Sequence, residues 1–252
     1  MILEYHRPET IERALELLAR PDPNTVPLGG GSVINAPSEQ DYDVVDLQLL
    51  NLHKITKKGN TLQIGATASL QTLLDNPHLP TALADTIKHE ASYNIRQVAT
   101  VAGALVSADG RSPFAAACLA LDTKLTFLPE DEIVSYGDLL PLRAERLPKR
   151  LITQITIPLQ TKLAYRYVAR SPADLPIVCV ALAQWSSGRT RLVLGGYGTT
   201  PVLAMDGGQT DGLIPAVENA FSHAQDEWAS AEYRLDIAKT LVKRCLNQIS
   251  IT

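Results

Sequence analysis

Four small residues after a short apolar run are the first candidates for ligand chemistry. Residues 25–28 have the composition of a strand, and the chain continues directly into Gly29-Gly30-Gly31-Ser32. Glycine has no Cβ, so the backbone N–H groups of this segment can approach a phosphate or pyrophosphate group closely, and Ser32 adds a hydroxyl. Ile34 stands where a GxGxxG fingerprint needs its third glycine, and the P-loop pattern also fails, so neither fold is indicated. The alternative is a tight structural turn.

A second stretch of small residues also leaves its backbone open to a ligand. It comprises residues 100–104 (TVAGA) and 107–112 (SADGRS). Its hydroxyl groups, those of Thr100, Ser107 and Ser112, can form hydrogen bonds, and Arg111 can pair with an anion. The alternative, which local chemistry favours, is a packing surface beneath the apolar segment 114–121.

The other reactive residues show no arrangement typical of catalysis or metal binding. Cys118, Cys179 and Cys245 are far apart and have no CxxC spacing, which disfavours an iron–sulfur cluster or a structural zinc site in this chain. None of the five histidines is paired with another at ligand spacing, and the nucleophile elbow G-x-S-x-G is absent. We therefore predict no catalytic side chain and no metal site.

The composition is that of an ordinary globular protein. Of the 252 residues, 45% are hydrophobic and 20% charged, and the net charge of −4 argues against a general nucleic-acid binder. The apolar run 177–183 is far too short to cross a bilayer, and the charged residues near the start argue against a signal peptide. An odd number of separated cysteines is typical of a reduced, cytoplasmic protein. We expect neither a nucleic-acid partner nor a membrane partner.

Hydrophobic periodicity and turn residues predict both helices and strands. Predicted helices cover 11–18, a stretch beginning at Ser69, 79–89, 114–121, 214–222 and 230–248. Predicted strands cover 25–28, 44–47, 55–57, 61–64, 124–128, 163–169, 176–183 and 190–196, and residues 94–104 are expected to be extended. After a boundary near Pro158 the last three strands form a meander that two helices close. The predicted fold class is α+β with two lobes.

In their order along the chain, these segments resemble the flavin-binding medium subunits of molybdenum hydroxylases. PLGGGSVI (27–34) resembles the first FAD loop of that family, and NIRQVATVAGALVSADGRSPFAAACLALD (94–122) resembles its second FAD loop and the helix that follows. LQIGATASL (62–70), YRYVARSPADLPIVCVALA (165–183) and LGGYGTTPVLA (194–204) are similar to further segments of the family. Each motif is weak alone, and their shared order makes the resemblance specific.

The resemblance implies a fold and a division into domains. It implies a two-lobed FAD-binding domain of the vanillyl-alcohol-oxidase-like (PCMH) type over residues 1–160, with subdomains of about 1–54 and 55–160. A smaller C-terminal domain of the kind found in the carbon monoxide dehydrogenase flavoprotein is implied over 161–252, with a three-stranded antiparallel sheet and helices.

The same resemblance implies an FAD-binding oxidoreductase subunit that transfers electrons. In the family, the flavin takes electrons from iron–sulfur clusters on a partner and passes them to NAD⁺, oxygen or another acceptor. The implied partners are a small subunit with [2Fe–2S] clusters and a molybdopterin large subunit, within a hetero-oligomer. Two glycine loops hold FAD in the family through backbone N–H groups. Carried over position by position, the implied cofactor-binding residues are Leu28, Gly29, Gly30, Gly31, Ser32, Thr100, Gly103 and Ser112.

The second loop departs from the family pattern at three positions. Ala102 replaces a glycine, Ala104 an asparagine and Pro113 an aspartate. Each lost polar side chain would cost about 1–3 kcal/mol if its FAD partner stayed buried and unpaired. One alternative is therefore a non-catalytic scaffold or assembly subunit of the same fold that has lost or weakened FAD binding. Another is a small-molecule binder that uses the glycine loops for a different phosphate ligand.

Overall fold

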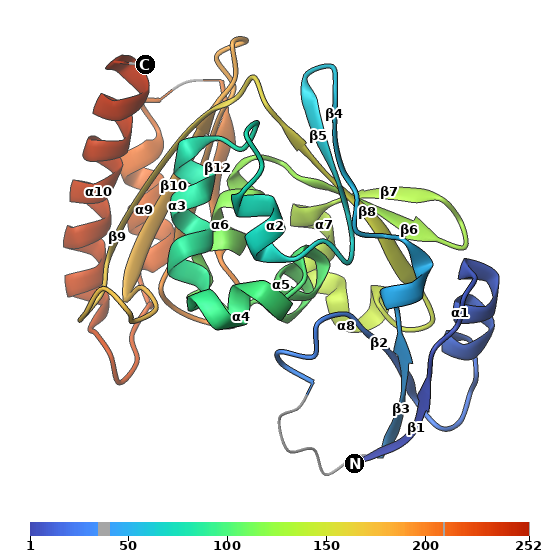
Figure 1. The fold of residues 1–252 in the computed structure, drawn as a ribbon. Helices are drawn as coiled ribbons and strands as arrows, with labels where there is room; N and C mark the ends of the chain where they lie inside the picture. The colour runs from blue at the N-terminus through green and yellow to red at the C-terminus, as the bar shows by residue number, and fades with distance from the viewer. Residues whose placement is uncertain (35–40, 209, 252) are drawn as a thin grey trace. The chain divides into compact units, whose positions relative to one another are not determined.

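The chain folds into a mixture of helices and sheets, which confirms the predicted α+β class (Figure 1). The computed structural model describes residues 1–34, 41–208 and 210–251. These form two compact units, each built from separate stretches of chain. The first unit contains Met1–Asn76, Tyr93–Ser107 and Lys124–Thr156, and the second contains Pro77–Ser92, Ala108–Thr123 and Ile157–Thr252. The domain division at residue 160 stays a prediction.

A parallel three-stranded sheet positions the glycine-rich segment in the first unit. Its order is β1 (Ile2–His6), β3 (Tyr42–Asp46) and β2 (Thr25–Leu28). Helix α1 (Ile11–Leu18) connects β1 to β2, and the Thr10 hydroxyl caps it by accepting the Arg13 N–H. The apolar stripe of α1 is buried among residues of this unit, so β2 is held in place as it leads into Gly29.

A five-stranded sheet is the other sheet of this unit. Its order is β4 (Ile55–Lys58), β5 (Thr61–Gly65), β8 (Leu151–Pro158), β6 (Lys124–Leu128) and β7 (Glu132–Ser135). The predicted hairpin is present, and Gly59 occupies its turn with a φ of 57°. The loop after β5 leads to α2 (Leu70–Leu74), which the Ser69 hydroxyl caps as expected. Strands β7 and β8 were not among the predicted strands.

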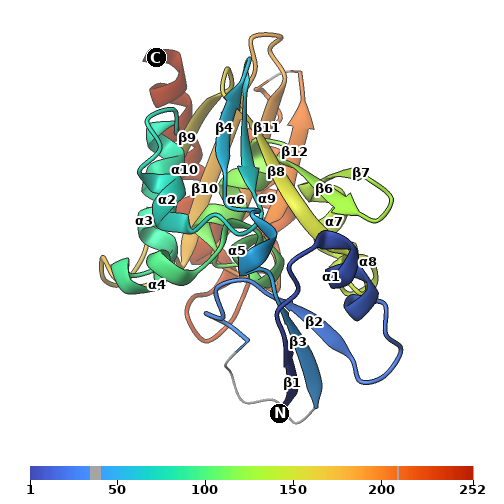
Figure 2. The same cartoon turned by 45° about the vertical axis from the view of Figure 1, so that its right-hand side comes forward.

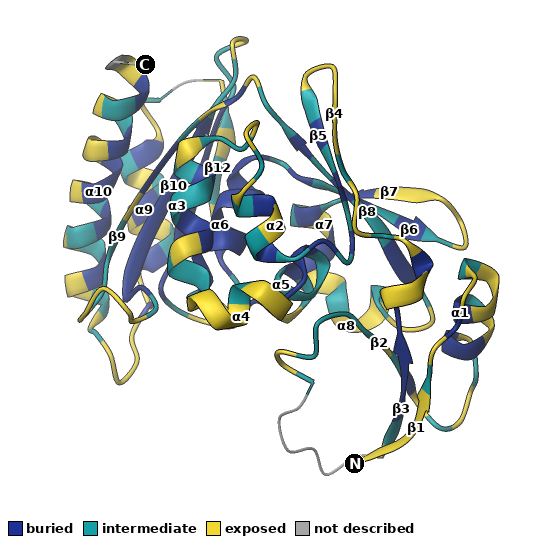
Figure 3. Cartoon of the chain, in the orientation of Figure 1, coloured by how far each residue is buried: buried dark blue, intermediate teal, exposed yellow. Residues whose placement is uncertain are grey.

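The prediction that residues 94–104 are extended is wrong. They form two short helices, α4 (Tyr93–Val98) and α5 (Val101–Ser107), and only Thr100 makes an isolated bridge, to Ser69. The reason is local capping, because the Thr100 hydroxyl accepts the Gly103 N–H at 3.1 Å and starts α5. Figure 3 shows α4 largely exposed, so its sequence lacks the apolar stripe that would have revealed a helix.

The short elements before β8 complete the first unit. They are α7 (Tyr136–Leu139), a 3₁₀ turn at Leu140–Leu142 and α8 (Arg143–Arg146). Another 3₁₀ turn, Gln48–Leu50, follows β3. The buried Tyr136 hydroxyl donates to the Leu105 carbonyl at 2.9 Å, which fixes the end of α5.

The second unit is an antiparallel sheet with helices on both faces (Figure 2). Its order is β12 (Val202–Gly207), β11 (Thr190–Gly195), β10 (Val178–Gln184) and β9 (Lys162–Val168). The expected sheet of three strands therefore has a fourth, β12, whose residues are half-buried or exposed and give little hydrophobic signal. Helices α9 (Leu213–Phe221) and α10 (Ala231–Ile251) cover one face, while α3 (Thr81–Glu90) and α6 (Pro113–Ala120) pack on the other. Because both faces are covered, β10 is buried along almost its whole length. Within the described ranges, no helix has the length and apolar content needed to cross a membrane.

Candidate functional site

The first small-residue stretch meets the start of the second inside the first unit. A Cβ added to Gly30 would lie 1.6 Å from the Val98 carbonyl oxygen, and one added to Gly29 would lie 2.6 Å from the Thr100 hydroxyl. The first glycine segment therefore packs directly on the junction between α4 and α5, where there is no room for a side chain. Of the predicted site residues, this contact brings Leu28 to Ser32 together with Thr100 and Gly103.

The first segment has backbone donors that the described protein does not use. None of the N–H groups of Gly29, Gly30, Gly31 and Ser32 donates a hydrogen bond to a described residue. Gly31 has a φ of 70°, a left-handed conformation that favours glycine. Leu28 differs, because its carbonyl accepts the Leu47 N–H at 3.1 Å and ties the start of the segment to the sheet. Consecutive backbone N–H groups without a protein acceptor can bind an anionic group such as a phosphate.

The first turn of α5, in the second stretch, has no such donors to offer. The first N–H groups of α5 are all paired within the protein: Val101 to the Ala68 carbonyl at 2.8 Å, Ala102 to the Ala66 carbonyl at 3.3 Å, and Gly103 to the Thr100 hydroxyl at 3.1 Å. A Cβ on Gly103 would lie only 2.8 Å from that hydroxyl. This stretch therefore acts as a close-packed floor beneath the first segment, and the first segment supplies the donors.

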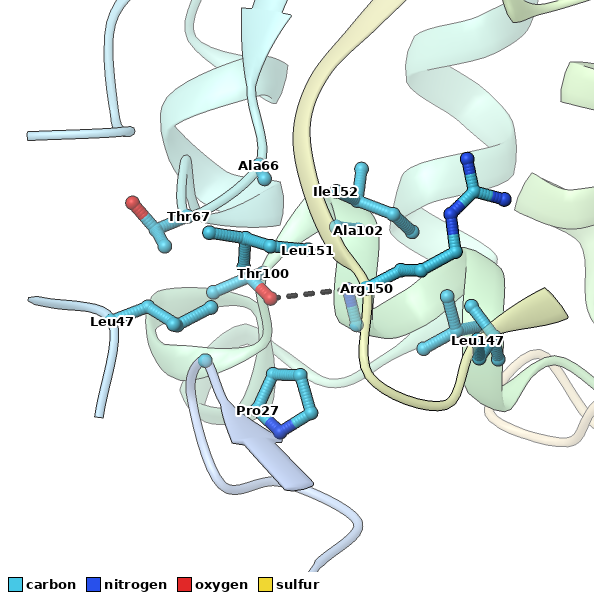
Figure 4. Close-up of a pocket in the computed structure, with 13 residues that line it drawn as sticks. Pro27, Leu47, Ala66, Thr67, Thr100, Ala102, Leu147, Arg150, Leu151 and Ile152 are labelled. Carbon is cyan, nitrogen blue, oxygen red and sulfur yellow. Dashed lines mark hydrogen bonds between the residues drawn. The ribbon is translucent and has the colours of Figure 1, made fainter. Parts of the chain in front are cut away.

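Three hollows adjoin the contact between Gly29 and Thr100. One of about 130 Å³ is mainly apolar, and Figure 4 shows Pro27 and Leu47 opposite Leu147 around it. The Arg150 guanidinium leaves this hollow to pair with Glu130 and Glu132 on the surface. A hollow of about 220 Å³ is lined by residues 27–34 and by four residues of the floor, Thr100, Gly103, Val106 and Ser107.

The third hollow, of about 270 Å³, is polar. Its side chains include Gln48, His53, Thr67, Ser69 and Gln97, and it also reaches Gly29 and Gly30. The glycine segment thus lies between the apolar hollow and the polar hollow. This arrangement suits a ligand that combines a ring system with charged groups. Thr67, Ser69 and Gln97 lie in the segments 62–70 and 94–122 that resemble the family, but none of these polar side chains was a predicted site residue.

Ser112 lies in the second unit and has partners there. It caps α6: its hydroxyl accepts the Ala115 N–H at 3.1 Å and donates to the Glu90 carboxylate, 2.8 Å away. The Phe114 N–H donates to the same carboxylate at 3.0 Å. Burial raises the pKa of Glu90 to about 7, and Coulombic repulsion from Asp109 adds to this shift. The role of Ser112 in holding a cofactor stays a prediction.

A cluster of metal-ligand side chains lies elsewhere in the first unit. Glu4, His6 and Asp43 bring ligand-type atoms within 4.8 Å of one another, which their sequence spacing did not indicate. His6 Nε2 is 3.2 Å from Glu4 Oε2 and 3.4 Å from Asp43 Oδ2. Arg20 Nη1 lies 3.4 Å from the same nitrogen. The positive charge of the Arg20 guanidinium disfavours a metal cation beside His6. We therefore interpret this cluster as an ion-pair network.

Comparison with known proteins gives matches over most of the chain. The model of a family described as the FAD binding domain in molybdopterin dehydrogenase matches residues 1–160. An Escherichia coli K12 protein, the uncharacterised YgfM, is 32% identical over 248 residues, which cover 96% of this chain and 94% of the relative. The carbon monoxide dehydrogenase medium chain of Afipia carboxidovorans is 24% identical over 275 residues, covering 97% of this chain and 96% of that one.

The fold is also found among solved structures. A chain of carbon monoxide dehydrogenase from Hydrogenophaga pseudoflava, solved without the Mo-pyranopterin moiety of its cofactor, matches with a TM-score of 0.81. It is 21% identical and covers 98% of this chain and 96% of its own length. At this identity the match establishes a common fold.

Proposed function

Because the chain belongs to the family of FAD-binding domains in molybdopterin dehydrogenases, we propose that it binds FAD at the glycine segment and transfers electrons in a larger complex. The membership confirms the resemblance seen in the sequence. It makes the chain an oxidoreductase subunit of the flavoprotein class, with FAD as its cofactor.

One observation carries the assignment to the glycine segment. The four successive N–H groups of Gly29 to Ser32 donate to no other described residue, and they lie beside both apolar and polar hollows. These N–H groups would hold the pyrophosphate, and Thr100 and Gly103 would support the segment from below. When bound, FAD supplies the redox chemistry by accepting and releasing electrons. The protein residues bind and orient it, and no side chain of this chain is assigned an acid–base role.

The partners and the location are part of the same proposal. The medium-chain relative belongs to carbon monoxide dehydrogenase. We infer that this chain likewise works beside a [2Fe–2S] small subunit and a molybdopterin large subunit, and hands electrons to an external acceptor. Cys118, Cys179 and Cys245 are free and buried, which supports a reducing, cytoplasmic setting.

A scaffold with weakened FAD binding is the second candidate function. The observation that favours it is the state of α5, whose first N–H groups are already paired. In addition, Ala104 and Pro113 lack the polar side chains of the family pattern. The first segment alone would then have to hold the cofactor.

Flavin released from the purified chain distinguishes the two candidates. We expect a yellow protein that releases about one FAD per chain when denatured, as measured by absorption and chromatography. A colourless protein that also fails to take up added FAD would support the scaffold. In that case the double change Ala104→Asn and Pro113→Asp should raise FAD retention without altering the fold, whereas an already saturated site would rule out the scaffold.

A further inference from the structure

We propose that the second unit has a binding site for a phosphate group, formed by Arg111, Arg170 and Trp228. The centres of both guanidinium groups lie 4.5 Å from the ring centroid of the same indole. Trp228 is 37% exposed and Arg170 is exposed, so solutes can reach the cluster. The proposal rests on these residues alone and is independent of the FAD assignment.

Backbone contacts hold Arg111 in position for binding. Its Nε donates to the Pro176 carbonyl at 3.0 Å and its Nη2 to the Leu175 carbonyl at 2.7 Å. Guanidinium has five N–H donors, so three remain for a ligand. The loop that carries Arg111 is fixed as well, because Gly110 exchanges backbone hydrogen bonds with Gly196 and Gly198 at 2.7 and 3.0 Å.

The backbone that carries the indole is held equally firmly. The backbone N–H of Trp228 donates to Asp226 Oδ1 at 2.8 Å, and the fully buried Arg234 donates to the same oxygen at 2.7 Å. Arg234 also donates to the Ala224 and Ala229 carbonyls at 2.8 and 2.9 Å, which closes the loop around Trp228. A pre-positioned guanidinium and aromatic ring lose little freedom when a ligand binds.

The two guanidinium groups have no carboxylate partner among the described residues. Neither Arg111 nor Arg170 forms an ion pair there. The nearby acids are used otherwise: Asp226 pairs with Arg234, and Asp109 accepts the backbone N–H of Arg111 at 2.7 Å. Two cations beside one ring leave positive charge that no described carboxylate neutralises, so an anion that accepts from their free donors would be stabilised.

The other tryptophan of the chain provides the contrast. Arg189 stacks over Trp185 at 4.9 Å, but it pairs with Asp206 at 2.7 Å and with Asp122 at 3.2 Å. The cation–π contact there is neutralised within the protein, and the contact at Trp228 is not. Of these two arginine–tryptophan clusters, the one formed by Arg111, Arg170 and Trp228 therefore carries positive charge without a carboxylate partner among the described residues.

Guanidinium geometry selects the class of ligand. The planar fork of arginine matches phosphate oxygens, and two such groups suit a dianion better than a monoanion. The site would thus take inorganic phosphate or the phosphate of a nucleotide. These two sources share the same chemistry, and the titration below separates them.

Tryptophan fluorescence tests the proposal directly. The Trp185→Phe variant leaves Trp228 as the single tryptophan of a chain that has two. We expect inorganic phosphate, pyrophosphate and AMP to change its emission in a saturable way at low salt, and acetate to do so far more weakly. Tighter binding of AMP than of phosphate would identify a nucleotide as the source. If Trp185→Phe disturbs the fold, calorimetry on the unmodified chain makes the same comparison.

Matched variants separate this site from general charge attraction. Arg170→Ala should weaken phosphate binding about tenfold or more, since a hydrogen bond to a charged group is lost. Arg244→Ala removes one exposed guanidinium from the same unit and should leave the affinity within about twofold. Equal weakening by both variants, or no saturable signal with any phosphate, would overturn the proposal. So would displacement of phosphate by one equivalent of FAD, because the anion site would then belong to the flavin.

Discussion

Gly30 shows how the site depends on single residues. A Cβ added to Gly30 would lie 1.6 Å from the Val98 carbonyl oxygen. This oxygen belongs to the backbone and cannot rotate away as a side chain could. In Gly30→Ala either the glycine segment or the α4–α5 junction must shift. We expect FAD affinity to fall about tenfold or more and the free energy of unfolding to fall by about 1–3 kcal/mol.

The matched control for this change is Gly207→Ala. Gly207 has no heavy atom within 4 Å of its added Cβ, so the substitution meets open space. FAD titration and urea denaturation of both variants make the comparison. If Gly30→Ala binds FAD as tightly as Gly207→Ala does, the close packing of the segment has no role in cofactor binding.

The sequence indicated the close approach at Gly29 to Gly31, but it did not indicate which groups Ser112 contacts. The lack of a Cβ is a property of the residue itself, so a run of glycines indicates close approach wherever it occurs. The pairing of Ser112 with Glu90 depends on a partner 22 residues away in the chain. A lone glutamate at a helix end carries no signal for such a contact.

At the scale of elements, the N-terminus of α6 depends on an unusual carboxyl group. Glu90 accepts hydrogen bonds from Ser112 and Phe114, yet burial raises its pKa from 4.5 to about 7. The folded state therefore holds this proton more tightly than the unfolded state. The stabilisation is complete below about pH 4.5 and is lost as the pH rises towards 7, by at most about 1.4 kcal/mol per pH unit.

The Glu90→Gln variant tests this linkage. A neutral amide of the same shape cannot lose a proton, so the variant should gain stability relative to the unmodified chain between pH 5 and pH 8. Urea denaturation at both pH values measures the free energy of unfolding. A difference between the two proteins that is equal at pH 5 and pH 8 would show that Glu90 does not titrate in this range.

Two of the elements that sequence reasoning missed, α4 and β12, share a physical cause. Helix α4 and strand β12 are largely exposed or half-buried, so their hydrophobic residues do not follow a helical or strand period. Strands β5 and β10, which are buried on one or both faces, were located nearly to the residue. A consistently buried face gives an element the hydrophobic period by which it can be located in the sequence.

At the scale of the whole molecule, collinear motifs revealed more than local chemistry. Each glycine stretch alone fitted a structural turn or a packing surface, and only their order along the chain pointed to a flavin-binding family. The local sequence also predicted the same role for both stretches, namely to offer backbone N–H groups to a ligand. In the structure the N–H groups of residues 29–32 donate to no described residue, whereas those of residues 101–103 donate to the loop after β5 and to the Thr100 cap. The backbone N–H groups of distant segments cannot be assigned partners until the fold is known.

Hydrogen exchange with and without FAD tests this division most directly. The amides of residues 29–32 donate to no other described residue, so they should exchange rapidly in the free chain and slow markedly when FAD binds. The amides of residues 101–103 are already paired and should exchange slowly in both states. Rapid exchange at 29–32 that persists in the FAD-bound chain would contradict the assignment of the cofactor to the glycine segment.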